Sequence, residues 1–138
     1  MSKKNCKVTS REMGDEGEQI ATDFLKRKGY KIIDRNFWCR QGEIDIIAKK
    51  EDEYVFCEVK TRKNLKYGEP RDSVNEIKRK HILDATRYYL YKNDLYDKYI
   101  RFDVIEVYIY KNKNYINHIK NANFNMKWIS SKKCKFWL

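Results

Sequence analysis

Hydrophobic and polar residues alternate along two neighbouring segments near the middle of the chain, 42–48 and 55–62. Alternation with a period of two is typical of a strand that buries one face. The residues between the segments are polar and have no helical period, so the simplest interpretation is a β-hairpin. Glu51 and Asp52 are then expected at its tip.

A turn at Glu51 and Asp52 fixes the pairing of the two strands and therefore decides which side chains share a face of the hairpin. One face is predicted to be wholly apolar, formed by the facing pairs Ile44–Val59, Ile46–Cys57 and Ala48–Val55. On the other face Asp45 lies opposite Glu58, at a Cβ separation of about 5 Å, where two like charges are destabilising. A sequence that accepts such a pair beside Lys60 predicts a cation between the two acids.

The rest of the chain supplies further elements of both kinds. They are expected, in order, as a helix over about 14–28 that ends at Gly29, strands over 30–38, 42–48 and 55–62, a helix from a Ser73–Glu76 capping box to about 91, and a strand over 101–110. A short additional strand is expected around 115–119. The predicted fold class is α/β (α+β), one mixed sheet flanked by helices in the order α-β-β-β-α-β.

The same pattern divides the chain into three parts. Residues 1–12 are polar and basic and are expected to form a flexible N-terminus. Residues 13–110 hold the predicted helices and the main strands, which is enough for one core. Residues 111–138 are rich in Asn, Lys and aromatic side chains and are expected to form a C-terminal extension.

Glu18 is placed on the core-facing stripe of the first predicted helix, with Ala21 and Leu25. A glutamate on that stripe is unfavourable unless it finds a cation or a hydrogen-bond donor. It is either part of a site or a first-turn acid stabilised by the helix dipole, an effect of about 0.3–1 kcal/mol. The sequence alone leaves both interpretations open.

Composition narrows the range of partners. The formal net charge is +11 and the pI about 9.4, an excess that favours a polyanion, either nucleic acid or an anionic membrane surface. No apolar run approaches the ~20 residues needed to cross a bilayer. The start has no signal-peptide pattern, so a cytoplasmic location without membrane association is expected. The 4 cysteines form no Cys-x-x-Cys pair, which argues against zinc or redox chemistry.

The acids of the hairpin fit a particular chemistry. Carboxylate oxygens of Asp45 and Glu58, with the carbonyl of Val59, are hard ligands that suit Mg²⁺ or Mn²⁺. Bound metal can polarise a phosphate and acidify a water, and Lys60 can orient that water or stabilise charge on phosphoryl oxygens. The alternative is an exposed charged face whose ion pairs are worth less than about 1 kcal/mol each.

Basic residues follow this constellation in the sequence and are expected to neutralise phosphates of a nucleic acid, in a sequence-independent and salt-sensitive way. Each alone is more simply read as a solvated surface charge. An aromatic ring among them, Tyr67, would stack on unpaired bases. For the second helix, either Ile77 or Lys78 is expected on the inner face. The predicted nucleic-acid-binding set is Arg62, Lys63, Lys66, Tyr67, Arg71, Lys78, Arg79 and Lys80.

Six short motifs occur in order between about Gly14 and Glu106. They are Gly14-x-x-Gly17-Glu18, Arg35-Asn36-Phe37, Gly42-Glu43-Ile44-Asp45-Ile46-Ile47-Ala48, Phe56-Cys57-Glu58-Val59-Lys60-Thr61-Arg62, Tyr67-Gly68-x-Pro70 and Arg101-Phe102-Asp103-Val104. On these motifs the chain resembles the YraN-like family of small bacterial proteins. That family resembles the PD-(D/E)xK nuclease superfamily, which has the restriction-endonuclease-like fold, and is especially similar to archaeal Holliday-junction resolvases.

The resemblance implies roles for individual residues. Asp45, Glu58 and Lys60 match the superfamily motif, with Ile44 in place of its proline, and Glu18 matches the acid on the first helix. The resemblance implies a Mg²⁺- or Mn²⁺-dependent endonuclease that hydrolyses phosphodiester bonds in branched or single-stranded DNA. Because junction resolvases are dimers, it also implies a homodimer. The alternatives are a nucleic-acid-binding protein that keeps the nuclease fold with little or no catalysis, and a regulatory protein whose basic face contacts acidic partners.

Overall fold

The computed structural model describes residues 10–62, 76–95 and 97–122. Its elements are α1 (Ser10–Arg27), β1 (Lys31–Cys39), β2 (Gly42–Lys50), β3 (Glu53–Arg62), α2 (Glu76–Lys92), β4 (Tyr99–Tyr110) and β5 (Lys113–Ile119). The predicted elements and their order are confirmed, but the capping box at the start of the second helix is not tested, because its Ser73 lies outside the described residues. The short strand expected near 115–119 is present as β5, and it adds a last strand to the order.

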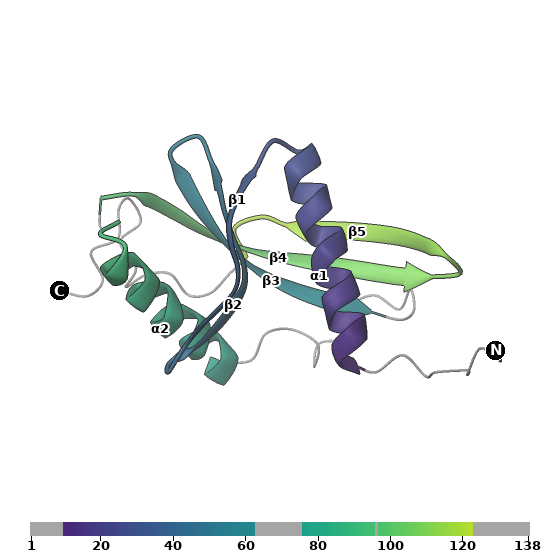
Figure 1. Ribbon diagram of the computed structural model, residues 1–138, viewed down its shortest axis with the longest axis horizontal. Helices are drawn as coiled ribbons and strands as arrows, with labels where there is room; N and C mark the ends of the chain where they lie inside the picture. The colour runs from purple at the N-terminus through teal and green to yellow at the C-terminus, as the bar shows by residue number, and fades with distance from the viewer. Residues whose placement is uncertain (1–9, 63–75, 96, 123–138) are drawn as a thin grey trace, which may run out of the picture.

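The strands form one mixed sheet of five strands in the order β1-β2-β3-β4-β5. Neighbours are antiparallel except β3 and β4, which are parallel because the chain returns through α2 before it enters β4. Figure 1 shows α1 crossing one face of the sheet near β3 and β4, with α2 beside β2. This is the mixed α/β arrangement of a restriction-endonuclease-like fold.

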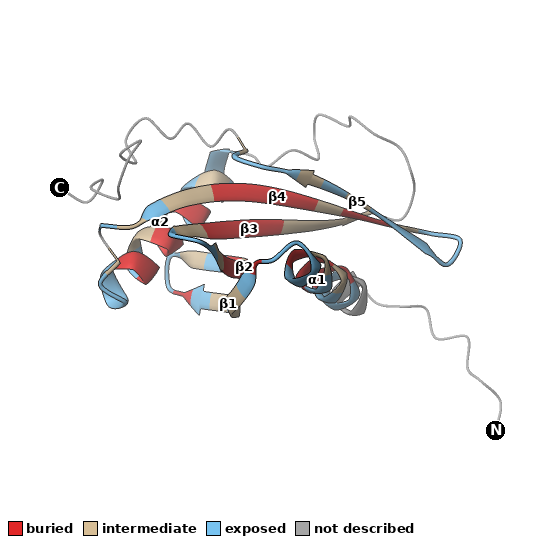
Figure 2. Cartoon of the chain, turned by 90° about the horizontal axis from the view of Figure 1, so that it is seen from above, coloured by how far each residue is buried: buried red, intermediate tan, exposed pale blue. Residues whose placement is uncertain are grey.

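Each helix closes a separate core on its own face of the sheet. Ala21 and Leu25 of α1 pack with Ile46, Ala48 and other residues of β2 to β4. The α2 core is formed by Ile82, Leu83, Ala85, Tyr89 and Leu90 with Phe56 and Phe102 of the sheet. The middle stretches of β3 and β4 are therefore buried, as Figure 2 shows.

One prediction about these faces is wrong. Ile44 packs in the α2 core with Ile47 and not beside Ile46, so the alternation of β2 breaks between Ile44 and Ile46. The break lies across from Asn36 of β1, between the pairs Arg35–Ile46 and Phe37–Ile44. Asn36 has a φ of +53°, a left-handed conformation that a regular strand does not contain.

The ends and contacts of α1 are set by two glycines. Gly29 has a φ of +91°, and the N–H of Tyr30 donates to the carbonyl of Leu25, so the predicted left-handed helix end is confirmed. Gly17 lies where α1 passes closest to β3: a Cβ built there would be 1.9 Å from Oγ1 of Thr61. The absence of a side chain at Gly17 lets the helix pack directly on the end of β3.

A buried charge network fixes β5 to β4. Asp103 has no exposed surface, and its carboxylate accepts hydrogen bonds from Arg101, from the N–H of Asn121 and from Nε2 of His118 at 2.7 Å. Burial opposes ionisation, but these donors and the Arg101 charge outweigh it and lower the pKa of Asp103. His118, on β5, is held by the same acid and packs edge-on against Phe24 of α1.

Candidate functional site

The two strands of the central hairpin separate before they reach the predicted acids. Pairing between β2 and β3 is confirmed from Lys50–Glu53 to Ile46–Cys57, in the predicted register. Beyond that point β2 continues beside β1, and β3 continues beside β4. Figure 1 shows β2 turning towards α2 while β3 runs with β4. We call the place where the strands part the fork.

The fork changes how Asp45 and Glu58 meet. The predicted facing pair is wrong, because the ladder ends one position earlier, at Ile46–Cys57. Asp45 instead crosses the opening: its Oδ2 accepts a hydrogen bond of 2.8 Å from the N–H of Val59, the residue after Glu58. A side-chain hydrogen bond thus takes the place of the main-chain pairing that is missing here.

The charges around Asp45 identify which acids lie near it. Burial raises the pKa of Asp45 to about 8, and the charges of Glu58 and, more weakly, Glu18 add to the rise. The hydrogen bond from Val59 and the charge of Lys78 act in the opposite direction but are outweighed. The charges of carboxyl groups from α1 and β3 therefore act on Asp45 of β2 at the fork.

Glu18 follows Gly17, which packs on Thr61 near the end of β3. Its residue surface is 7% exposed, and its Oε1 lies 3.6 Å from Nη2 of Arg35 on β1. Burial, the largest influence, raises the pKa of Glu18. Oε1 is buried and has no hydrogen bond within the part of the chain that the structure describes. The position on the core-facing stripe is confirmed, and the side chain contacts Arg35 of β1.

Glu58 has a different partner. It is buried, and Nζ of Lys78 forms an ion pair with its Oε1. Burial lowers the pKa of Lys78, but the hydrogen bond and charge of Glu58, with the charge of Asp45, outweigh this and raise it. Ile77 is 70% exposed, so of the two candidates for the inner face of α2 it is Lys78 that turns towards the sheet. Sequence reasoning placed Lys78 with the phosphate-binding residues and missed this contact.

Lys60 lies two residues after Glu58 on β3, so both side chains leave the same face of the strand. It is partly buried and is paired across the parallel ladder with Glu106 of β4. The order acid, intervening residue, lysine thus runs along the strand edge that borders the fork.

The other predicted phosphate-binding residues are only partly described. Arg62, at the end of β3, donates through Nε and Nη2 to Glu106 at 3.2 and 3.1 Å. Lys80 forms an ion pair with Asp84 at 2.8 Å, and Arg79 beside it is partly buried. Lys63, Lys66, Tyr67 and Arg71 lie outside the described residues.

The donors at the fork suit a hard divalent ion. Asp45 and Glu58 offer carboxylate oxygens, Val59 offers a carbonyl, and the buried Oε1 of Glu18 has no hydrogen-bond donor among the described residues. Burial, followed by the charge of Glu58, opposes ionisation of Asp45 and raises its pKa. In the described residues, no group of three or more His, Cys, Asp and Glu side chains is close enough to form a metal cluster. The candidate metal ligands are therefore two side chains and a backbone carbonyl, and Glu18 lies further out.

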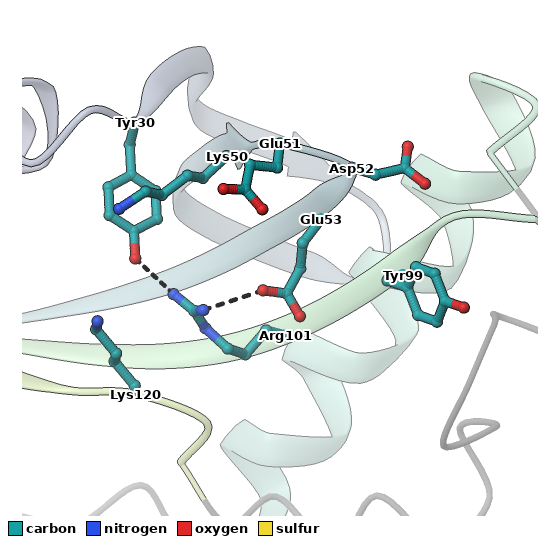
Figure 3. A pocket seen from close by; sticks show the side chains of 8 residues that line it. All are labelled: Tyr30, Lys50, Glu51, Asp52, Glu53, Tyr99, Arg101 and Lys120. Atoms are coloured by element: carbon teal, nitrogen blue, oxygen red, sulfur yellow. Dashed lines mark hydrogen bonds and ion pairs between the residues drawn. The ribbon is translucent and has the colours of Figure 1, made fainter.

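A pocket of about 390 Å³ lies elsewhere, at the tip of the β2–β3 hairpin. Its floor is Arg101, which donates to Tyr30 and Glu53, and none of its lining residues belongs to the fork (Figure 3). The lining mixes three acids with two lysines and an arginine. These charges largely compensate one another, so the pocket has no clear preference for an anion or a cation.

Fold and site together define a class: a small α/β protein of restriction-endonuclease-like architecture with carboxylates gathered where two sheet strands part. Across the described ranges, no helix has the length and apolarity to span a bilayer. Residues 17–107 match the model of the uncharacterised protein family UPF0102. The chain belongs to this family, the YraN-like family whose motifs it carries.

The segments that match this chain span almost the whole length of each relative. A UPF0102 protein of Clostridioides difficile is 50% identical over 115 residues, which is 83% of this chain and 99% of that protein. One from Caldicellulosiruptor saccharolyticus is 44% identical over 117 residues, 83% of this chain and 99% of the relative. A third, from Clostridium perfringens, is 44% identical over 118 residues, 84% and 97% of the two chains.

Proposed function

We propose that this protein is a metal-dependent endonuclease that hydrolyses phosphodiester bonds in branched or single-stranded DNA, with Mg²⁺ or Mn²⁺ as cofactor. The observation that carries the proposal is the placement of Asp45 at the fork, where it bonds to the N–H of Val59 beside the buried Glu58. Burial, and then the charges of Glu58 and Glu18, raise the pKa of Asp45 to about 8. Acids whose mutual repulsion is tolerated inside a fold are typical of sites that take up a cation. The excess of basic residues supports a polyanionic substrate.

Each residue of the fork has a role in this proposal. Asp45, Glu58 and the carbonyl of Val59 would hold the ion, which would supply Lewis-acid polarisation of a phosphate oxygen and a more acidic water. Lys60 would orient that water or stabilise charge that develops on the phosphoryl oxygens. Glu18, buried on α1 and further out, would add a further carboxylate. Basic side chains around the fork would position the DNA backbone without reading its sequence.

The test is cleavage of a defined set of DNA substrates in the presence of Mg²⁺ or Mn²⁺. Four-way junctions, flaps and single strands are incubated with the wild type, Lys60→Ala and Lys113→Ala, the last an exposed lysine on β5. We expect cleavage of at least one substrate, lost in Lys60→Ala and kept in Lys113→Ala. Cleavage that survives Lys60→Ala would remove this lysine from the mechanism.

The second candidate is a nucleic-acid-binding protein that keeps the nuclease fold with little or no turnover. It is favoured if no substrate is cleaved while DNA binding, measured by fluorescence anisotropy, remains strong. The proposal also includes the homodimer of the resolvases, which sedimentation of the free protein and of its DNA complex would detect.

A further inference from the structure

Lys78 of α2 forms an ion pair with Glu58, the acid of β3 that the proposed function assigns to the metal. Nζ of Lys78 pairs with Oε1 of Glu58, and Glu58 is 6% exposed while the Lys78 side chain is 48% exposed. The pair thus has a buried carboxylate and a cation that reaches it from the surface. Such an arrangement allows the lysine to leave without opening the core.

The rotation of α2 places Lys78 on the face that meets the sheet. Lys78 shares a helical stripe with the buried Ile82, Ala85 and Tyr89, so burial of that stripe directs Lys78 to the sheet and leaves Ile77 exposed. There the charges of Glu58, Asp45 and Glu43 all attract Lys78.

We propose that Lys78 is a positioning residue that holds Glu58 in the metal-free protein and gives it up when a divalent ion binds. The inference rests on the proposed function, since it concerns the same carboxylate. An ammonium group and a divalent ion compete for one carboxylate oxygen, because the two cations repel each other. The long side chain, anchored on α2 at the rim of the fork, would then turn to a phosphate oxygen of the substrate.

The role differs from that of Lys60. Lys60 leaves the same strand as Glu58, whereas Lys78 belongs to a separate helix and can move relative to that strand. Competition for Glu58 makes a clear prediction: removal of the Lys78 charge should strengthen metal binding, whereas removal of a ligand should weaken it.

The experiment is a calorimetric titration of Mn²⁺ alone into the wild type, Lys78→Gln and Asp45→Asn. Lys92→Gln, an exposed lysine in the last turn of the same helix, is the control for the change in net charge. We expect Lys78→Gln to bind Mn²⁺ about twofold to fivefold more tightly, the equivalent of a partly exposed ion pair. Lys92→Gln should match the wild type. Unchanged or weaker binding in Lys78→Gln would overturn the inference.

A second measurement follows the pair without metal. In EDTA, the stabilities of Lys78→Gln, Glu58→Gln and the double variant form a double-mutant cycle. We expect the double variant to lose less than the sum of the single variants; additive losses would overturn the inference. Lys78→Met, which keeps most of the aliphatic chain, replaces Lys78→Gln if the latter does not fold.

The two proposals fail in different ways. If neither the wild type nor Asp45→Asn takes up Mn²⁺, the metal site itself is refuted, and the exchange at Glu58 falls with it. If the wild type binds Mn²⁺, Asp45→Asn does not, and Lys78→Gln behaves as the wild type, the proposed site stands and only the role of Lys78 is refuted.

Discussion

Replacement of Asp45 by asparagine is expected to stabilise the metal-free protein at neutral pH while it abolishes affinity for divalent ions. Asparagine has nearly the same shape and can still accept the hydrogen bond from the N–H of Val59. It cannot ionise, so the repulsion from Glu58 and Glu18 and the cost of a buried charge are removed together.

The size of the effect follows from the pKa of Asp45, which rises from 3.8 to about 8 on folding. Between these values the native state keeps a proton that the unfolded state has released, so stability falls as pH rises, by at most about 1.4 kcal/mol per pH unit. The upper limit at pH 7 is about 4 kcal/mol. Because Asp45 is only partly buried, solvent screening reduces this, and we expect about 1–3 kcal/mol.

The assay is urea unfolding in EDTA near pH 5 and pH 8. The stability gained by Asp45→Asn over the wild type should grow with pH across this interval and level off above about pH 8. Asp52→Asn, at the exposed hairpin tip, is the control and should follow the wild type. The reasoning is refuted if Asp45→Asn and the wild type show the same pH dependence, or if the variant is less stable at the higher pH.

Three further outcomes are expected. Gly17→Ala should lose about 1–3 kcal/mol in urea unfolding, because its Cβ would meet a β3 side chain at 1.9 Å. Gly14→Ala, with nothing within 4 Å, should be neutral or gain up to about 1 kcal/mol; equal effects would contradict the close packing of α1. Asp103→Asn leaves Arg101 and His118 without their shared anion and should lose about 2–4 kcal/mol. Hydrogen exchange along β5 should then accelerate, and unchanged protection would argue against the network. Finally, DNA affinity should fall by at least about tenfold between about 50 and 200 mM salt, and an anisotropy titration insensitive to salt would exclude backbone-driven binding.

The central hairpin could be predicted because its signals are local. Alternation fixed both strands, and the polar residues Glu51 and Asp52 fixed the turn, so the pairs from Ile46–Cys57 to the tip followed directly. The end of α1 at Gly29 was predicted for the same reason. Both depend on residues close together in the chain.

The fork could not be predicted, because its causes are distant in sequence. The break in β2 lies across from Asn36, whose left-handed conformation leaves no pattern in a strand that otherwise reads as regular. The alternation rule therefore put Ile44 on the wrong face and Asp45 in the wrong pair. The partner of Glu58 comes from a helix that begins 18 residues later, at Glu76, and only the rotation of that helix selects Lys78 over Ile77.

The fork gives the two ends of one hairpin different mechanical properties. Near the turn, main-chain hydrogen bonds keep the strands at a fixed spacing. At the far end, the Asp45–Val59 hydrogen bond joins β2 to β3 in place of a ladder, and each strand stays attached to its outer neighbour. A change in the distance between the two strands there disturbs no main-chain pair of the β2–β3 ladder, while the closed end preserves the alignment of the two strands.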